Sequence, residues 1–515
     1  MNTMKKFLTN IAVVSAMVIG LSACSLDAIV YSDMTSGNYP KVESDAQSLL
    51  DGMYGYLKTN SGSVSMSTTA NTGWGWPVWS IGTIGWYGWQ MFTTDEARYG
   101  GASNQYTDFT WGTTGSWLQT FQIIKNVSRM TYIIDVIENC EGISDSKKAR
   151  MIAEAKTLRG IFMYVIYDLF GPFHVTLDPA ELDDIKYVAR PSDAEYRTNM
   201  IKDFEDAIPN LVDKTNNTAD WGRLNKGFVR MLLAKIYMRK HEYAKALPYL
   251  EAIVNSNQYT LAEDYFVPFS EEEDDENIYC IPSGPKADNE FYFYMTPGNC
   301  GAFLGVNKAH SHDGQGTFNT QNYWGGAKVQ WAFYDTFKDY DVRKGGMAEA
   351  FRDATDPTKI YTRENPGSSN LQYGAMCCKY FYSKERAYEG NIHSVCFRYA
   401  DCLLMIAECD AMINGVPTDR SMKYLKMITD RAGNTSDIPA DAATNLESFK
   451  TFLLAERGRE LYFEGWRRDD LLRFDQYISN AVARGKRAEE KHKLMPIPIS
   501  VINESGGIIT QNPGY

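Results

Sequence analysis

Aromatic side chains crowd into one short segment of the chain. Positions 74–89 carry five tryptophans and one tyrosine, separated by glycines and a proline: Trp74, Trp76, Trp79, Trp86, Tyr87 and Trp89. An indole ring offers a large, rigid apolar face and loses little side-chain entropy when it is covered. Such rings stack well on the flat C–H faces of neutral sugars, so the segment is a candidate ligand-binding loop.

The same rings could instead fill a core between helices. The glycines interrupt both the two-residue period of a strand and the 3.6-residue period of a helix, which weakens this interpretation. We expect about half of the rings to be structural. Two more aromatic groups follow in the middle of the chain, Phe291 to Tyr294 and the trio Tyr323, Trp324 and Trp331.

Metal and nucleic-acid chemistry find little support. The acidic run at 271–276 lacks the glycine turn and alternating ligands of an EF-hand, which favours a solvated loop. His310 and His312 have metal-ligand spacing but form an isolated pair, so we expect no metal and no cofactor. The net charge of −12 and the absence of a basic block argue against nucleic acid as a partner.

Catalytic motifs are also missing. The sequence has no His-Glu-x-x-His, no Gly-x-Ser-x-Gly elbow and no phosphate-binding glycine loop. A glycoside hydrolase needs only two carboxylates roughly 5 to 10 Å apart, and the many acidic residues leave that alternative open. The interpretation that we favour is a binding protein, not an enzyme.

Amphipathic helices must position these loops. Capping boxes at Ser44 and Ser192 each precede apolar residues at helical spacing, and a further helix runs to Gly171-Pro172, where proline stops it. Between 226 and 253 the pattern of small and aromatic residues fits a tetratricopeptide unit. Such a unit needs neighbours to bury its apolar face.

The chain therefore divides into a scaffold and loops. We expect the helical-repeat scaffold at about 117–170, 192–260 and 399–432, with the ligand-binding loops at about 60–115 and 270–395. Long loops without periodicity are uncommon unless they bind something.

The N-terminal residues predict export. Two lysines precede an apolar run at 11–21 that is too short to span a membrane, which is typical of a signal peptide at 1–23. Residues 21–24 (LSAC) resemble a lipobox, which implies lipidation at Cys24 and a mature domain at 24–515. The other eight cysteines show no regular framework and are best interpreted as small buried residues, although a disulfide stays possible.

The C-terminal sixty residues carry the most specific signal. The segments ERGRELYFEGWRRDDLLRF at 456–474, LMPIP at 494–498 and QNPGY at 511–515 resemble the SusD/RagB family. Supporting matches in the family's order include TDE at 94–96 and FGP at 170–172. The resemblance implies a mostly α fold, in which four tetratricopeptide-like helix pairs support a loop-rich lobe with few short strands.

The resemblance also implies a role. A member of this family is a lipid-anchored protein at the cell surface of the outer membrane that captures glycans for a SusC-like TonB-dependent transporter. Its platform is commonly built from an early loop and a mid-chain insertion. The residues that we expect to contact ligand are Trp74, Trp76, Trp79, Trp86, Trp89, Tyr292, Asn322 and Trp324, with Asn71 as an alternative polar partner.

Charged residues of the 456–474 segment recur at spacings of three and four. We expect them to form structural ion pairs along one helix face, and not to catalyse a reaction: Arg457, Glu460, Glu464, Arg467 and Asp470. Two alternatives to glycan capture stay open besides the hydrolase. They are capture of peptides by the same architecture and a scaffold that binds another protein.

Overall fold

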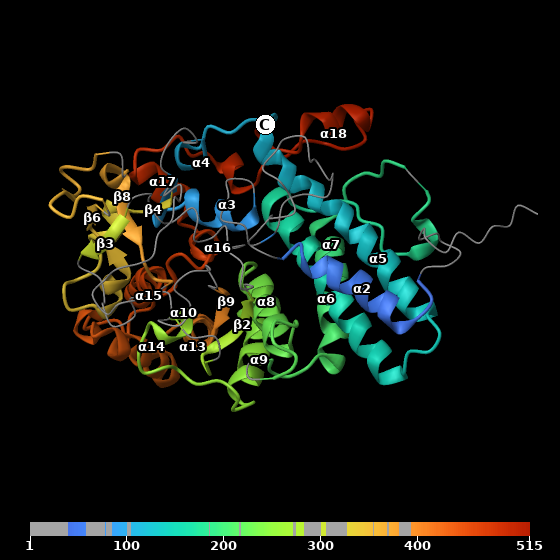
Figure 1. Cartoon of the computed structure of the whole chain (residues 1–515), viewed down its shortest axis with the longest axis horizontal. Helices are drawn as coiled ribbons and strands as arrows, with labels where there is room; N and C mark the ends of the chain where they lie inside the picture. Colours follow the sequence, from blue (N-terminus) through green and yellow to red (C-terminus); the bar gives the residue numbers. More distant parts are fainter. Residues whose placement is uncertain are drawn as a thin grey trace, which may run out of the picture.

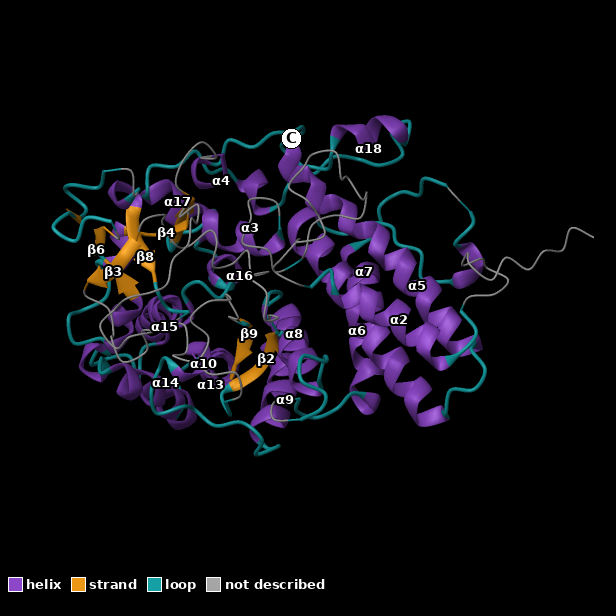
Figure 2. Ribbon diagram, viewed as in Figure 1, coloured by secondary structure: helices purple, strands orange, loops and turns teal. Residues whose placement is uncertain are grey.

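The computed structural model describes most of the chain. The described residues are 40–57, 78, 85–99, 105–184, 186–215, 218–270, 274–282, 300–304, 327–353, 355–367, 370–380 and 393–515, with backbone alone at 116–119, 270 and 300–303. Helices dominate the structure (Figure 2). The predicted mostly α fold is confirmed.

One group of helices lies on the right in Figure 1 and comes from the first half of the chain. It comprises α2 (Glu43–Tyr54), α5 (Ile124–Asn139), α6 (Asp145–Phe170) and α7 (Asp193–Ala207). Helix α6 packs against α5, α7 and α2, and its seventeen buried residues make it the axis of this group. The Ser192 hydroxyl caps α7 by accepting from the Glu195 N–H, as the capping box predicts.

The second group packs through small side chains. It comprises α8 (Lys226–Met238), α9 (Tyr243–Val254), α13 (Tyr399–Asn414), α14 (Asp419–Ala432) and α15 (Leu446–Leu461). Helices α8 and α9 pack against each other, and Ala234 and Ala246 are fully buried. Alanine at such positions lets two helix backbones approach closely, and α9 then packs on α13.

Shorter helical segments connect these groups and the sheets. The α-helices among them are α3 (Trp86–Phe92), α4 (Gln105–Asp108), α10 (Val267–Ser270), α12 (Trp331–Tyr334), α16 (Arg467–Arg473), α17 (Tyr477–Ala483) and α18 (Ile499–Glu504). The 3₁₀ turns are η1 (Ser116–Ile123), η2 (Pro179–Glu181), η3 (Ile208–Asn210), η5 (Val342–Gly346), η6 (Leu371–Tyr373), η7 (Thr435–Asp437) and η8 (Glu490–Lys493).

The described strands form three small antiparallel sheets. Their orders are β1 (Ala97–Tyr99), β4 (Ala327–Gln330), β8 (Gly374–Cys377), β5 (Met347–Ala348); then β2 (Asn277–Ile281), β9 (Ser394–Arg398); then β3 (Cys300–Leu304), β6 (Ala350–Asp353), β7 (Ile360–Tyr361). Strands β3, β4, β6 and β8 gather on the left in Figure 2, while β2 and β9 lie nearer the centre beside α8. The β1–β4 and β2–β9 pairs each join strands that are far apart in the sequence. The two regions that were expected to be loops are therefore tied together by strand pairing.

A cluster of buried charges lies where the second helical group meets the strands. Arg398, at the end of β9, is fully buried and donates to the carboxylates of Glu276, Glu460 and Glu464. Glu460 also accepts from Arg431 at 2.6 Å and pairs with Arg343 at 3.1 Å. A buried charge is tolerated only when it is paired and hydrogen-bonded, so these segments must assemble together.

The structure corrects the expected ion pairs along one helix face. Helix α15 ends at Leu461 and α16 begins at Arg467, and between them Phe463 and Gly465 take φ angles of +56° and +82°. Asp470 does pair with Arg473 three positions later on α16, but the partners of the other four residues lie on other elements. Arg457 bonds Asp401 and Asp470, while Arg467 bonds Asp95.

The described cysteines fit the expectation of small buried residues. Those that the structure describes with side chains are buried free thiols: Cys140, Cys280, Cys377, Cys378, Cys396, Cys402 and Cys409. Cys24 lies outside the described residues. Within the described ranges, no helix combines the length and apolar character that a membrane crossing requires.

Replacement of Glu460 tests the buried cluster. Burial raises the pKa of this carboxyl, but Arg431, Arg398 and Arg343 outweigh burial and lower it to about 2. The ionised form therefore stabilises the fold above the unfolded pKa of about 4.3, and this contribution is lost as the pH falls toward 2. We expect Glu460→Gln to cost about 3–5 kcal/mol at pH 7 and to flatten the loss of stability below pH ~4.5, as measured by urea unfolding.

Glu447→Gln is the matched control. Its carboxylate is exposed and pairs only with Lys450, three positions away, so its replacement should change stability by less than about 0.5 kcal/mol. Equal effects of the two substitutions would contradict the assigned importance of the Glu460 cluster.

Candidate ligand-binding site

Two of the expected ligand-binding tryptophans belong to the core. Trp86 and Trp89 lie on α3 and are each 1% exposed. The Trp86 indole N–H donates to Asp168 at 2.8 Å, and its ring packs against Trp466 with 5.4 Å between ring centroids. Trp89 packs edge-on against Tyr106 and Trp111. The expectation that Trp86 and Trp89 contact ligand is therefore wrong.

The error has a local cause. The glycines suggested an irregular loop, but Gly85 serves as the extended N-cap of α3 and Gly88 is accommodated within its two turns. The rings of Trp86 and Trp89 are three positions apart, which is the spacing of one helix face. That spacing was the available signal that these two rings are structural, in line with the expectation that about half of the aromatic segment fills the core.

The remaining candidates lie outside the described residues. They are Trp74, Trp76, Trp79, Tyr292, Asn322 and Trp324, together with the alternative Asn71. Between Trp74 and Ile84 the structure describes Val78 alone, which is 1% exposed. Its N–H donates to the Tyr56 carbonyl at 2.8 Å, and its carbonyl accepts from the Tyr87 N–H at 3.1 Å. Val78 thus joins the chain after α2 to the start of α3.

Strand pairing joins the early and middle loop regions. Tyr99, at the end of β1, pairs with Ala327, at the start of β4. The Gln330 side chain strengthens the junction by donating to the carbonyls of Thr94 and Ala97 at 2.8 and 2.9 Å. Ala327 follows the candidate residue Trp324 by three positions. The start of β4, close to this candidate in the sequence, is therefore held against β1.

Two pairs of an arginine and an aromatic ring, which sequence patterns did not reveal, involve β1 and the segments that follow β4 and β7. The Arg98 guanidinium lies 4.5 Å from the ring centroid of Tyr373, and both residues are partly exposed. Arg363 lies 4.7 Å from the ring of Trp331, whose indole N–H donates to the Leu371 carbonyl at 2.7 Å. Guanidinium and phenol groups can hydrogen-bond to hydroxyl ligands. No local spacing could have joined positions so far apart.

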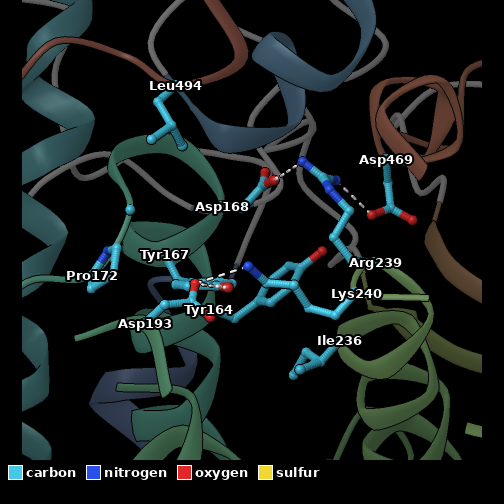
Figure 3. Close-up of a pocket in the computed structure, with 11 residues that line it drawn as sticks. Tyr164, Tyr167, Asp168, Pro172, Asp193, Ile236, Arg239, Lys240, Asp469 and Leu494 are labelled. Atoms are coloured by element: carbon cyan, nitrogen blue, oxygen red, sulfur yellow. Dashed lines mark hydrogen bonds and ion pairs between the residues drawn. The ribbon is translucent and has the colours of Figure 1, made fainter. Parts of the chain in front are cut away.

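A cavity of about 200 Å³ with both polar and apolar lining lies elsewhere, where α6, α7, α8 and α16 converge (Figure 3). Its lining comprises Tyr164, Tyr167, Asp168, Gly171, Pro172, Asp193, Ile236, Arg239, Lys240, Asp469 and Leu494. Burial raises the pKa of Asp168, but Arg468 and Arg239 outweigh it and hold the pKa below its usual value. Among the described residues, no group of histidine, cysteine and carboxylate side chains is arranged to hold a metal ion.

Comparison with known proteins identifies the family. Residues 251–515, just over half of the chain, match the SusD family. The chain belongs to this family. The resemblance of the C-terminal motifs to SusD/RagB proteins is thereby confirmed.

A curated relative and several solved structures agree with this membership. The chain is 22% identical over 385 residues to SusD-like protein P25 of Formosa agariphila, covering 70% of this chain and 69% of that protein. Surface glycan-binding protein A from Bacteroides thetaiotaomicron, solved with laminarihexaose, is 19% identical with a TM-score of 0.68, over 92% of this chain and all of that one.

Two further structures extend the comparison. A laminarin-binding SusD-like protein gives a TM-score of 0.70 at 18% identity, over 92% of this chain and 100% of that one. A SusD superfamily protein from Parabacteroides distasonis gives 0.69 at 21% identity, over 94% and 100%. These likenesses show that this SusD-family chain shares the fold of those proteins.

The structural role of Trp86 can be measured directly. In this SusD-family protein, Trp86→Ala should remove about 3–5 kcal/mol of stability, because it leaves a cavity beside Trp466 and takes a hydrogen bond from the buried Asp168. Calorimetry should record a lower melting temperature. Tyr132→Ala is the control: it removes an aromatic ring that is 43% exposed and should change the melting temperature little. An unchanged melting temperature for Trp86→Ala would refute the assignment of Trp86 to the core.

Proposed function

We propose that this SusD-family protein captures glycans at the cell surface on an aromatic surface, without cleaving them. The observation that supports the proposal is the pairing of β1 with β4, because it joins the chain after the tryptophan-rich segment to the chain after Trp324. Two relatives of the same fold are a surface glycan-binding protein solved with laminarihexaose and a laminarin-binding protein.

The chemistry of capture follows from the residue types. Rings stack on the C–H faces of sugars, and neighbouring amides, phenols and guanidinium groups hydrogen-bond to the hydroxyls. We assign the stacking role to Trp74, Trp76, Trp79, Trp324 and Tyr292, and the polar role to Asn322. The partly exposed Arg98 and Tyr373 extend this surface on the described side.

The titration of described carboxyls favours binding over hydrolysis. A glycosidase needs a carboxylic acid with a raised pKa next to its substrate. Burial raises the pKa of Glu96 well above its usual value and that of Asp274 to about 6. These two side chains are 1% and 7% exposed, so neither can reach an external glycan. Incubation with a glycan panel should therefore yield no cleavage products.

Tryptophan variants test the aromatic surface. Titration calorimetry against a polysaccharide panel should detect binding by the parent, and Trp74→Ala and Trp324→Ala should each weaken it at least tenfold, because removal of a stacking ring costs a binding hot spot about 2 kcal/mol. Melting temperatures of the variants should stay close to that of the parent.

Tyr132→Ala on α5 serves as the binding control, since it removes a 43% exposed aromatic ring from the first helical group. Full affinity of both tryptophan variants for each glycan that the parent binds would exclude the proposed surface. Binding of peptides, with no glycan bound, would instead favour the peptide-capture alternative.

Lipid anchoring and the transporter partnership form the second part of the proposal. We assign the lipid to Cys24, the location to the outer membrane and the partner to a SusC-like TonB-dependent transporter, on the basis of the LSAC tetrapeptide at 21–24 and the family membership. Cys24→Ala should abolish lipid labelling in cells and release the protein from the membrane fraction.

The parent should copurify with the transporter, and its failure to do so after mild detergent extraction would contradict the partnership.

A further inference from the structure

The cavity at the end of α6 has the size of a site for one small ring. Its volume is about 200 Å³. Sites for drug-sized molecules occupy about 300–1,000 Å³, so an oligosaccharide does not fit inside. The cavity is separate in its residues from the proposed aromatic surface.

One hydroxyl in this cavity lacks an internal partner. Tyr164 is 7% exposed, and its hydroxyl makes no hydrogen bond with any residue that the structure describes. Its ring packs edge-on against Trp86 and extends toward Arg239 and Lys240 (Figure 3). By contrast, the neighbouring Tyr167 hydroxyl donates to Asp193 at 2.6 Å. The Tyr164 oxygen is not among the described buried atoms that lack a partner, so it faces the cavity, where water or a ligand can complete its hydrogen bond.

Further hydrogen-bonding capacity faces the same space. Arg239 uses one terminal nitrogen to donate to Asp469 at 2.9 Å, while its other terminal nitrogen lies 3.7 Å from Asp168, beyond hydrogen-bond distance. The Lys240 ammonium donates to Oδ1 of Asp193 at 2.9 Å and has two more protons. Both described bonds to Asp193 use Oδ1, which leaves Oδ2 as an acceptor in the described part of the chain.

The charges around the cavity compensate one another. Asp193 pairs with Lys240, Asp168 pairs with Arg468, and Asp469 pairs with both Arg239 and Arg473. A charged ligand would meet groups of its own sign on one wall or another. A neutral ligand that both donates and accepts hydrogen bonds can use all of them, while its C–H groups contact apolar lining from Pro172, Ile236 and Leu494.

We propose that this cavity binds a single neutral sugar ring, a monosaccharide or an equally small cyclic polyol, through Tyr164, Arg239, Lys240 and Asp193. The ligand hydroxyls complete the hydrogen bond of Tyr164 and donate to Asp193 Oδ2. The site goes beyond the proposed aromatic surface, because it selects one ring in a small, partly open cavity instead of stacking an extended chain.

Saturation-transfer NMR and titration calorimetry with glucose, galactose, mannose and xylose test the proposal on the purified full-length protein. At least one of these sugars should bind saturably in the millimolar range, and galacturonate should bind more weakly than galactose. Tyr164→Phe should weaken binding about three- to tenfold, the usual effect of one lost hydrogen bond. Its melting temperature should not fall, because no described hydrogen bond is lost.

Lys240→Met is a second variant, at a partly exposed position, and should also weaken sugar binding. Tyr132→Phe is the matched control and should leave sugar binding unchanged. Absence of binding by all four sugars, or parental affinity in both cavity variants, would overturn the site. Trp324→Ala should retain monosaccharide affinity even where it loses polysaccharide, so the two proposals fail separately. Loss of monosaccharide binding in Trp324→Ala alone would also overturn the cavity assignment.

Discussion

The buried ion cluster around Arg398 is the constraint on which the rest of the structure depends. This guanidinium is fully buried and has three carboxylate partners: Glu276 beside β2, and Glu460 and Glu464 at the end of α15 and just after it. Such a cluster adds little net stability compared with apolar packing, because each charge must first leave water. Its effect is specificity: an arrangement that brings in the arginine without its carboxylates is strongly disfavoured, so the strands and helices around it have one acceptable assembly.

The segment after α15 extends this constraint to the aromatic end of the molecule. The Tyr87 hydroxyl donates to the Phe463 carbonyl, and Gly465 leaves room for the Tyr87 ring, since a Cβ there would lie 2.5 Å from it. Arg468 bonds Asp168, which in turn accepts from Trp86. Helix α3 is thus clamped between α6 and α16. Its position fixes where β1 emerges and meets β4.

This arrangement suits a binding protein. Affinity depends on how little freedom the ligand-contacting groups lose, so loops gain from rigid attachment points. Here the attachments are the anchored Val78 and the β1–β4 pair. The cavity beside Tyr164 is connected to the same group of contacts, because Asp168 lines the cavity and also accepts a hydrogen bond from Trp86 on α3. The rigidity of the buried charges therefore serves both proposed binding regions.

Local chemistry made several elements predictable from the sequence. The cap at Ser192, the helix pair within 226–253 and the stop at Gly171 follow from interactions within a few residues, and each appears in the structure as expected. The C-terminal motifs likewise identified the family, since their order along the chain is a property of sequence alone. The mostly helical fold followed from that resemblance.

Only the tertiary structure decided how distant charges and rings combine. Arg467 was expected to pair along its own helix, yet it bonds Asp95, and Trp86 was expected to face ligand, yet it donates to Asp168 in the core. The union of β1 with β4 was equally invisible, because more than two hundred positions separate the strands. Spacing reports neighbours within a helix or strand, whereas the partner of a buried charge or indole is set by which segments the folded chain brings together.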